Sequence, residues 1–411
     1  MTSSTHALAL CAIGLEKVCA SEIQRLGIEL EGREAGRVRF SLGTAGASSL
    51  VRANLCLRTA ERVLIEAGRF HAENFDELFE QVRSLPWEAY FGRDDRLVIE
   101  RVRTRDSRLA AQTSVQSIVH KAIYDRLGAV YRLTRLPESG TERGLRVYLD
   151  HDECVLGLDS SGEALHKRGY RRASGEAPLK ETLAAGILFL SGWNRRLPLL
   201  DPFCGSGTFA IEAALFAMDR APGLGRHFAL EDMPFVERGA VAAEFEAARA
   251  RVRTDVEFRI LGSDADPKAI AAARANAGRA GLGQDRLSQD RLSQDRLGQD
   301  RLGQDRLGQS VSFEQGKAED AAPRYEAGYL LGNPPYGERL GTQEEAEALY
   351  RRLGSAYERF TGWSLGFVTN RPDFGDFFGR KANSAKKIVN GAEEQWFHWY
   401  PASPQTPTRK D

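Results

Sequence analysis

An alternation of short apolar strands and helical segments runs through the second half of the sequence, over residues 177–335. Its segments are, in order, helix LKETLAAGILFLSG, strand PLLDPF, helix GTFAIEAALFAMD, strand FRILGSDAD, helix PKAIAAARANAGRA and strands SVSFEQG and YLLGNPP. Apolar strands separated by helices are typical of a parallel sheet that helices cover on both faces. The pattern therefore predicts a doubly wound, Rossmann-like α/β domain over residues 177–403.

Two smaller patterns precede this domain. Residues 1–62 read as a strand, a helix (15–26), a strand (37–41) and a second helical stretch (49–62). Residues 63–160 continue with strand VLIEAGRF, helix NFDELFEQVRSLPW, strand RLVIERVRT, helix TSVQSIVHKAIYDRLG and strands LRVYLD and ECVLGLD. The sequence predicts two α+β domains here, followed by a linker over residues 161–176.

The bulk composition indicates a multidomain protein without a membrane segment. At 411 residues the chain is long enough for two or three domains. It holds no apolar run near the roughly 20 residues that a membrane helix needs. Its five cysteines form no C-x-x-C pair, and no histidine cluster has metal-ligand spacing. We expect a cytoplasmic protein that binds no metal and does not enter a membrane.

A repeat of QDRLS and QDRLG units fills residues 284–308, inside the Rossmann-like domain. A leucine at every fifth position advances about 140° around a helix and alternates faces on a strand, so neither conformation gains an apolar face. The repeat predicts a flexible, charge-balanced insertion, with a partly helical arm held by Asp–Arg pairs as the alternative. Because it connects a helix to the next strand, it should lie away from the strand ends that bind ligands.

The segment LLDPFCGSGTFAIEAAL, residues 199–215, joins a strand to a helix through a glycine-rich turn. Glycine permits a tight turn and a close approach of the backbone to a ligand. The N-terminus of the following helix presents free N–H groups to an anionic group such as a carboxylate or a phosphate. The candidate cofactor-binding residues of this turn are Asp201, Phe203, Gly205, Gly207 and Thr208.

Two carboxylates, Asp264 and Asp266, follow the next strand in ILGSDAD. A carboxylate at this strand end can accept hydrogen bonds from both hydroxyls of a ribose, and Asp266 can equally cap the helix that begins at Pro267. The turn lacks both G-x-G-x-x-G spacing and the lysine of a phosphate loop, which argues against NAD and ATP. The two motifs resemble motifs I and II of class I S-adenosylmethionine-dependent methyltransferases. Cys204, inside the turn, is interpreted as a packing residue.

The strand YLLG ends in Asn333, Pro334, Pro335 and Tyr336. An exocyclic amine on a base is a poor nucleophile because its lone pair is delocalised into the ring. The side-chain oxygen of Asn333 and the carbonyl of Pro334 can accept its two N–H groups and turn the lone pair toward a methyl donor. Consecutive prolines hold the backbone stiffly, and Tyr336 offers a face for the base to stack on. We predict that these four residues are catalytic.

Several long stretches carry a resemblance to one family: ALHKRGYR (164–171), APLKETLAAGIL (177–188), DPFCGSGTFAIEAA (201–214), GSDADPKAI (262–270) and NPPYGERLG (333–341). They resemble bacterial THUMP-domain guanine-N2 methyltransferases, above all the N-terminal methyltransferase half of the bifunctional 23S rRNA enzymes and next the tRNA enzymes of the group. The opening GLEKVCASEIQRLG and the closing KKIVNGAEEQWFHWY, similar to the family's last hairpin, extend the likeness to nearly the whole chain outside the repeat. The resemblance implies a ferredoxin-like domain over 1–62, a THUMP RNA-binding domain over 63–160 and a Rossmann-like domain that transfers a methyl group from S-adenosylmethionine to N2 of a guanosine.

The same resemblance implies a set of RNA-binding residues in locally basic stretches. The formal net charge of the chain is +0, so an RNA site must be a local patch. Arginine and lysine on phosphates supply affinity that does not depend on sequence. The candidates are Arg101, Arg103, Arg105, Arg108 and Lys121 in the THUMP domain, and Lys167, Arg168 and Arg171 in the linker.

One position departs from the family pattern. Many class I enzymes carry an acidic residue near adenine at the third strand end, where FEQGKAED has Lys317. Glu319 or Asp320 could take that place after a small shift.

Other functions share parts of these motifs. Protein glutamine and DNA adenine-N6 methyltransferases also carry N-P-P-Y. The first would have a helical N-terminal domain, and the second would usually have a target-recognition region after or within the catalytic domain, whereas only a short tail follows Tyr400 here. A non-enzymatic RNA-binding role would predict erosion of Asp201, Gly205 or Asn333, and all three are present. We expect a monomer that acts on ribosomal RNA, with transfer RNA as the alternative.

Overall fold

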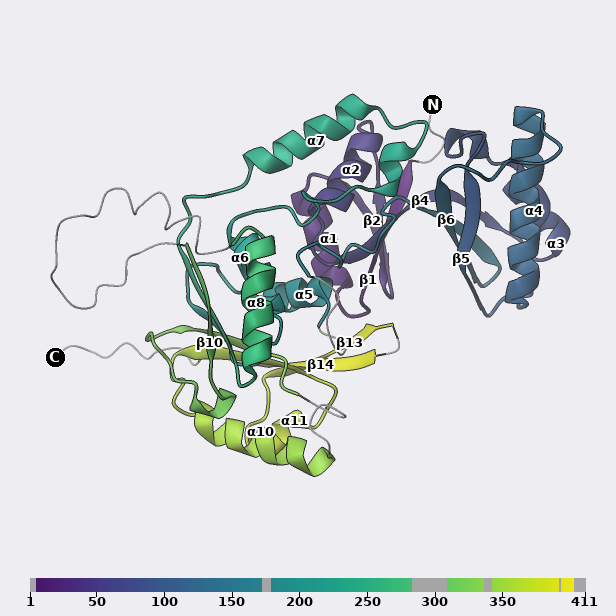
Figure 1. The fold of residues 1–411 in the computed structure, drawn as a ribbon. Helices are drawn as coiled ribbons and strands as arrows, with labels where there is room; N and C mark the ends of the chain where they lie inside the picture. The colour runs from purple at the N-terminus through teal and green to yellow at the C-terminus, as the bar shows by residue number, and fades with distance from the viewer. Residues whose placement is uncertain (1–4, 172–178, 283–308, 336–341, 392, 403–411) are drawn as a thin grey trace, which may run out of the picture. The chain divides into compact units, whose positions relative to one another are not determined.

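The computed structural model describes residues 5–171, 179–282, 309–335, 342–391 and 393–402 (Figure 1). The predicted repeat over 284–308 and Tyr336 lie outside these ranges. The described chain divides into two units: the first holds the residues up to Cys11, Glu16–His166 and Pro222–Ala250, and the second holds Ala12–Leu15, Lys167–Ala221 and the residues from Arg251 onward. Each unit is built on its own seven-stranded sheet.

The first unit has the strand order β2-β3-β1-β4-β7-β6-β5. Its elements are β1 (His6–Cys11), α1 (Glu16–Arg25), β2 (Leu30–Glu34), β3 (Arg37–Ser41), α2 (Ala47–Cys56), β4 (Ala60–His71), α3 (Phe75–Ser84), η1 (Trp87–Ala89), β5 (Arg96–Arg105), α4 (Gln112–Tyr131), β6 (Glu142–Asp150), β7 (Glu153–Asp159), η2 (Ala229–Asp232) and α7 (Arg238–Ala250).

Strand β4 belongs to both predicted N-terminal domains. Its first half pairs with β1, from Ala60 to Ile65, and its second half pairs with β7, from Leu64 to His71. The β-α-β-β-α-β order of the first six elements is that of a ferredoxin-like fold. The ferredoxin-like and THUMP parts therefore share one continuous sheet, and the predicted boundary at residue 62 falls inside a strand.

The predicted helical stretch over 49–62 is wrong in its second half, because α2 ends at Cys56 and β4 begins at Ala60. The cause lies far away in the sequence. The carboxylate of Glu22 accepts hydrogen bonds from the backbone N–H of Arg58, at 2.8 Å, and of Thr59, at 3.1 Å. Those N–H groups would continue a helix, but here a buried carboxylate binds them and the chain turns into a strand.

The second unit has the strand order β10-β9-β8-β11-β12-β14-β13, in which β14 alone runs antiparallel to its neighbours. Its elements are α5 (Glu181–Ser191), β8 (Leu199–Asp201), α6 (Thr208–Ala217), β9 (Phe258–Asp264), α8 (Pro267–Arg279), β10 (Gln309–Gln315), η3 (Ala318–Asp320), β11 (Gly328–Gly332), α10 (Gln343–Tyr357), β12 (Trp363–Thr369), α11 (Phe374–Phe378), β13 (Ser384–Asn390) and β14 (Glu393–Tyr400).

Helices cover both faces of this sheet, as the alternation of strands and helices predicts. Helices α5, α6 and α8 lie on one face, and α10 and α11 lie on the other (Figure 1). The core under α10 is rich in buried aromatic side chains, among them Tyr350, Phe367 and Phe374. The predicted closing hairpin is the β13–β14 pair.

The order of strands reverses between β8 and β11, since the chain builds outward from β8 to β9 and β10 on one side and from β11 to β12 on the other. A crevice opens at such a switch point, outside the carboxyl ends of the strands. No helix in the described ranges is both long and apolar enough to cross a membrane.

Candidate active site

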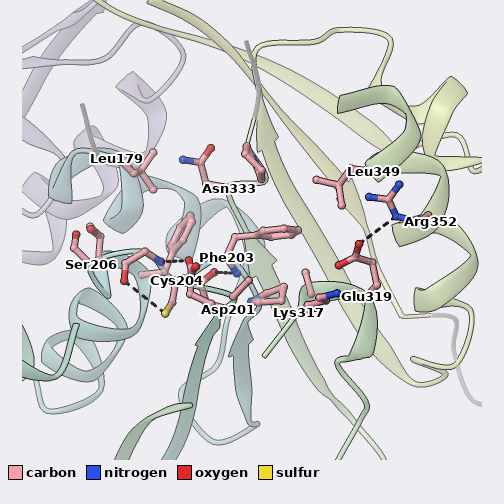
Figure 2. A pocket seen from close by; sticks show the side chains of 18 residues that line it. Leu179, Asp201, Phe203, Cys204, Ser206, Lys317, Glu319, Asn333, Leu349 and Arg352 are labelled. Atoms are coloured by element: carbon pink, nitrogen blue, oxygen red, sulfur yellow. Dashed lines mark hydrogen bonds and ion pairs between the residues drawn. The ribbon is translucent and has the colours of Figure 1, made fainter. Parts of the chain in front are cut away.

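A cavity of about 500 Å³ lies at the carboxyl ends of β8, β9, β10 and β11. Figure 2 shows the side chains that surround it, with Cys204 and Ser206 from the turn before α6 and Leu349 and Arg352 from α10. Predicted site residues that line it are Asp201, Phe203, Gly205, Thr208, Asp264, Asn333 and Pro335. The structure thus gathers residues that are up to 134 positions apart in the sequence, from Asp201 to Pro335.

The glycine-rich turn is held in place by its own backbone and by the neighbouring strand. Gly205 and Gly207 have φ angles of +49° and +86°, which glycine adopts readily. The N–H of Gly205 donates to Oδ2 of Asp264 at 2.9 Å. A Cβ atom on Gly207 would lie 3.1 Å from the side chains of Ala273 and Phe313, whereas one on Gly205 would meet nothing within 4 Å. Gly207 is therefore needed for packing, and Gly205 leaves room on the cavity side.

Asp201 is buried at the end of β8, with 1% of its surface exposed. Burial raises the pKa of its carboxyl to about 8; the N–H of Phe203, which donates to Oδ1 at 3.1 Å, lowers the pKa, and the nearby Asp264 raises it. A buried carboxyl with a raised pKa at a cavity wall is a frequent feature of functional sites.

The two carboxylates after β9 have different positions. Asp264 lines the cavity, and its Oδ1 accepts the N–H of Asp266 at 3.0 Å. Asp266 is the N-cap of α8, where its side chain accepts the N–H of Lys268 at 2.8 Å, and it is not among the lining residues. Of the two roles open to Asp266, the structure shows helix capping.

Cys204 packs in the interior, as the sequence interpretation holds. It is 5% exposed, and burial raises the pKa of its thiol. Gly262 on β9 makes room for it, because a Cβ atom at that position would lie 2.9 Å from Cβ of Cys204 and 2.8 Å from the ring of Phe313. A thiol that resists ionisation is a poor nucleophile.

Asn333 is the residue whose surroundings point most directly to a ligand. Its Oδ1 is buried and has no hydrogen-bond partner in the described part of the chain, and the residue lines the cavity. A buried acceptor without a partner costs free energy, which a bound donor would recover. Pro335 lines the same cavity, whereas the buried Pro334 between them is not a lining residue. The sequence places Tyr336 next, outside the described residues.

Arg171, a predicted RNA-binding residue, is largely buried beside the cofactor turn instead. One guanidinium nitrogen, Nη2, donates to the hydroxyl of Thr208 and to the carbonyl of Leu179 at 3.1 Å. Its Nε lies 3.5 Å from a carboxylate oxygen of Glu181. Since Thr208 and Leu179 both line the cavity, the hydrogen bonds of Arg171 link two segments of the cavity lining.

Arg168 is also buried, with 3% of its side chain exposed. Its Nε lies 3.8 Å from Glu212 on α6, and the same carboxylate oxygen accepts the hydroxyl of Tyr170 at 3.0 Å. The guanidinium groups of both arginines are thus largely buried in contacts within the second unit. Lys167, by contrast, is exposed.

The predicted RNA-binding residues of the first unit are exposed. Arg101, Arg103 and Arg105 alternate along β5 and so share a face of the strand. Arg105 pairs with Asp150 and Arg108 with Glu73, whereas the side chains of Arg101 and Arg103 have no ion-pair partner within the described ranges. The ammonium of Lys121 lies 5.5 Å from the ring centre of Phe79.

Sequence reasoning missed the part of the cavity wall that α10 supplies. Leu349 and Arg352 line the cavity, but they follow N-P-P-Y by more than ten residues and carry no local motif. At the third strand end, Lys317 and Glu319 both line it, and Oε1 of Glu319 accepts from Nε of Arg352 at 3.2 Å. Of the two predicted acidic substitutes, Glu319 is therefore at the cavity and Asp320 is not among its lining residues.

Fold and site together define a class I methyltransferase. The strand order, the glycine-rich turn at β8 and the carboxylate after β9 form a site for a nucleoside linked to a charged group. The chain fits such a ligand: Gly205 faces open space, and Ser206 Oγ and Asn333 Oδ1 are buried without partners among the described residues.

The chain belongs to the RMKL-like methyltransferase domain family, which matches residues 168–295 and 296–395. An RlmL ferredoxin-like domain matches residues 6–64, and a THUMP domain matches residues 72–159. The predicted fold class and family resemblance are confirmed.

Two curated relatives match almost the whole chain. YpsC of Bacillus subtilis (strain 168), named as a candidate RNA methyltransferase, is 34% identical over 402 residues, which cover 97% of this chain and 97% of YpsC. The ribosomal RNA large subunit methyltransferase K/L of Syntrophotalea carbinolica is 35% identical over 399 residues, which cover 93% of this chain and 51% of that protein. The chain thus spans nearly all of YpsC but about half the length of the K/L relative.

Two solved structures are similar over nearly their full length. SMU.472, described as a candidate methyltransferase complexed with SAH (S-adenosylhomocysteine), has a TM-score of 0.84 and 33% identity over 98% of this chain and 99% of that one. A protein from Listeria monocytogenes, described as a predicted N6-adenine-specific DNA methylase, has a TM-score of 0.85 and 36% identity over 98% of this chain and 97% of that one. S-adenosylhomocysteine is S-adenosylmethionine without its methyl group. Together with the family match, this confirms S-adenosylmethionine as the cofactor.

Proposed function

We propose that this chain transfers a methyl group from S-adenosylmethionine to the exocyclic N2 amine of a guanosine in RNA, in 23S rRNA first and in tRNA as the alternative. The observation that carries the proposal is the side chain of Asn333, whose Oδ1 is buried at the cavity without a partner in the described chain. An acceptor in this position is what a target amine requires.

The proposed reaction uses the chain to orient the amine rather than to attack it. S-adenosylmethionine supplies the methyl group as an electrophile. Oδ1 of Asn333 and the carbonyl of Pro334 each accept one N–H of the amine, so its lone pair points away from the ring and toward the methyl group. The amine nitrogen bonds to the methyl carbon, the bond from that carbon to sulfur breaks, and the amine then loses one proton to solvent. We propose that Tyr336 stacks on the base.

The cofactor residues are assigned by the same reasoning. Gly205, Phe203 and Thr208 are proposed to contact the methionine end, and Asp264 to accept the ribose hydroxyls. Asp264 retains this capacity because a carboxylate has about four acceptor positions, and backbone N–H groups occupy two of them. Asp201 supports the turn through the N–H of Phe203.

RNA is the proposed substrate because the chain carries a THUMP domain and because the relatives named above are ribosomal RNA or RNA methyltransferases. We propose an RNA surface on the first unit that includes Arg101, Arg103, Arg105, Arg108 and Lys121; Lys167, which belongs to the second unit, is a separate candidate. Arg101 and Arg103 are its best-placed members, since neither has an ion pair to break within the described residues. Monomeric state, cytoplasmic location and absence of a metal stay predictions.

The test replaces the target atom. Two transcripts of the same ribosomal RNA segment are made, one with inosine in place of guanosine, which removes the N2 amine, and one with 7-deazaguanosine, which keeps the amine and removes N7. With labelled S-adenosylmethionine, methyl incorporation should persist in the second transcript and vanish in the first. Incorporation into the inosine transcript at the level of unmodified RNA would refute N2 as the target.

A further inference from the structure

Helix α10 (Gln343–Tyr357) places a tyrosine hydroxyl against the N-P-P segment. Tyr350 is fully buried, with 0% of its surface exposed. Its hydroxyl donates to the carbonyl oxygen of Pro335 at 3.2 Å. Its ring packs edge-on against Phe374, with 4.8 Å between the ring centres. The hydroxyl therefore reaches the candidate active site from a rigid aromatic core.

The proline pair fixes the backbone of this segment except at its end. A residue that precedes proline is restricted in ψ, so Asn333 and Pro334 are both held by the proline that follows each of them. The ring fixes φ of Pro334 and Pro335. The sequence has Tyr336 after Pro335, so no proline ring restricts ψ of Pro335. The hydrogen bond from Tyr350 acts on the carbonyl whose direction that ψ angle sets.

The helix that carries Tyr350 is itself anchored and belongs to the cavity wall. A reciprocal capping box joins Thr342 and Glu345 at its start. Leu349 and Arg352, on either side of Tyr350 in the sequence, line the cavity (Figure 2). A hydroxyl on this helix is therefore a fixed point from which the N-P-P segment can be held.

Another tyrosine of the same helix shows that burial alone does not explain the hydroxyl bond. Tyr357 is 3% exposed, and its hydroxyl has no hydrogen-bond partner in the part of the chain that the structure describes. The two tyrosines have similar burial and lie on one helix. Only Tyr350 is bonded to the N-P-P segment.

We propose that Tyr350 is a positioning residue for methyl transfer. Its hydroxyl holds the carbonyl of Pro335, at the end of the segment that the prolines leave free. Because the rest of the segment is rigid, this anchor orients Asn333 and the carbonyl of Pro334 toward the target amine. The inference rests on the proposed function, in which those two acceptors orient the amine.

The experiment compares Tyr350→Phe with Tyr357→Phe in the full chain. Each variant removes one buried hydroxyl and keeps the ring, so packing is matched. The loss of one hydrogen bond corresponds to a factor of about 2 to 13 in an equilibrium or a rate. We expect kcat for RNA methylation to fall about three- to tenfold in Tyr350→Phe and less than twofold in Tyr357→Phe. The dissociation constant for S-adenosylhomocysteine, from calorimetry, should change less than twofold in both.

A double variant separates positioning from general stability. In the background of Asn333→Ala, Tyr350→Phe should reduce kcat less than twofold further, because the side chain that carries most of the positioning effect is absent. An undiminished loss in that background, or equal kcat values for the two single phenylalanine variants, would overturn the positioning role. Methyl transfer by the wild-type chain to an amine other than guanine N2 would refute the proposed substrate, and the same variants would then test Tyr350 on that amine. No transfer to any amine would overturn both.

Discussion

Replacing Arg171 by methionine should destabilise the second unit and leave RNA affinity unchanged. Methionine keeps much of the length of the side chain but removes its charge and its donors. The guanidinium bonds Thr208 and Leu179 and lies 3.5 Å from Glu181, whose side chain is 3% exposed. The change therefore leaves a buried carboxylate without its cation and two cavity walls without their link.

The magnitude follows from these contacts. Breaking a buried ion pair from one side costs about 3–5 kcal/mol. The side chain of Arg171 is 15% exposed, so we expect the lower end, about 3 kcal/mol. A loss of about 1 kcal/mol lowers the melting temperature of a domain of 150–250 residues by roughly 2–4 °C. The expected fall is therefore about 6–12 °C.

The loss should also depend on pH. Burial raises the pKa of Glu181, and the charge of Arg171 lowers it. Without the arginine, the pKa of the Glu181 carboxyl in the folded chain rises further above its value in the unfolded chain. The resulting loss of folding stability is absent below the unfolded pKa and grows as the pH rises through the folded pKa. The difference in melting temperature should be larger at pH 8 than at pH 5.

The matched control is Arg101→Met on the exposed face of β5. Its side chain has no ion pair within the described ranges, so its melting temperature should stay within about 1 °C of wild type. Its RNA affinity should fall, and the slope of the logarithm of the binding constant against the logarithm of the salt concentration should decrease in magnitude by about one. Calorimetric melting and filter binding measure both quantities. If Arg171→Met melts like wild type and binds RNA as weakly as Arg101→Met, then Arg171 contacts RNA and the structural assignment is refuted.

Three further predictions concern the cofactor side. Gly207→Ala should cost about 2–4 kcal/mol of stability, because the added Cβ combines a positive φ with contacts of 3.1 Å. Gly205→Ala should cost about 1 kcal/mol of stability but weaken the binding of S-adenosylhomocysteine at least tenfold. Melting curves measure the stability of each variant, and calorimetry measures its binding. Asp201→Asn should flatten the pH dependence of the melting temperature, since an acid whose pKa rises from 3.8 to about 8 on folding contributes stability that is full below about pH 4 and is lost as the pH rises through about 8; an unchanged profile would contradict this. Asp264→Ala should weaken the binding of S-adenosylhomocysteine more than the binding of methionine, which has no ribose. The substitution removes the proposed acceptor of the ribose hydroxyls and the partner of the Gly205 N–H.

Much of the second unit could be predicted because its determinants are local. The β8 turn is specified by glycines, the strand ends by carboxylates, and the N-P-P rigidity by the prolines themselves. These signals stand within a few residues of the groups that they position. The carboxyl ends of parallel strands then meet at one edge of the sheet, which brings Asp201, Asp264 and Asn333 together without further information.

The failures involve partners that are distant in the sequence. The end of α2 depends on Glu22, which stands 36 residues before Arg58. The burial of Arg168 depends on Glu212 on a later helix, so a basic stretch that resembles an RNA contact became an interior ion pair. The part of the cavity lining that α10 supplies, Leu349 and Arg352, depends on how this helix packs against β11 and β12. In each case tertiary contacts outweigh what the local sequence indicates.

The most direct test of the central claim identifies the methylated nucleoside. In separate reactions, the purified chain and labelled S-adenosylmethionine are incubated with unmodified 23S rRNA or with unmodified tRNA. Each RNA is then digested, and the nucleosides are identified by mass spectrometry, with Asn333→Ala as the control. The account predicts N2-methylguanosine in the ribosomal RNA, strongly reduced with the Asn333→Ala variant; the same product in tRNA alone would move the substrate to the alternative. Methylation of adenosine or of a ring nitrogen, or undiminished N2-methylguanosine with the variant, would contradict the account.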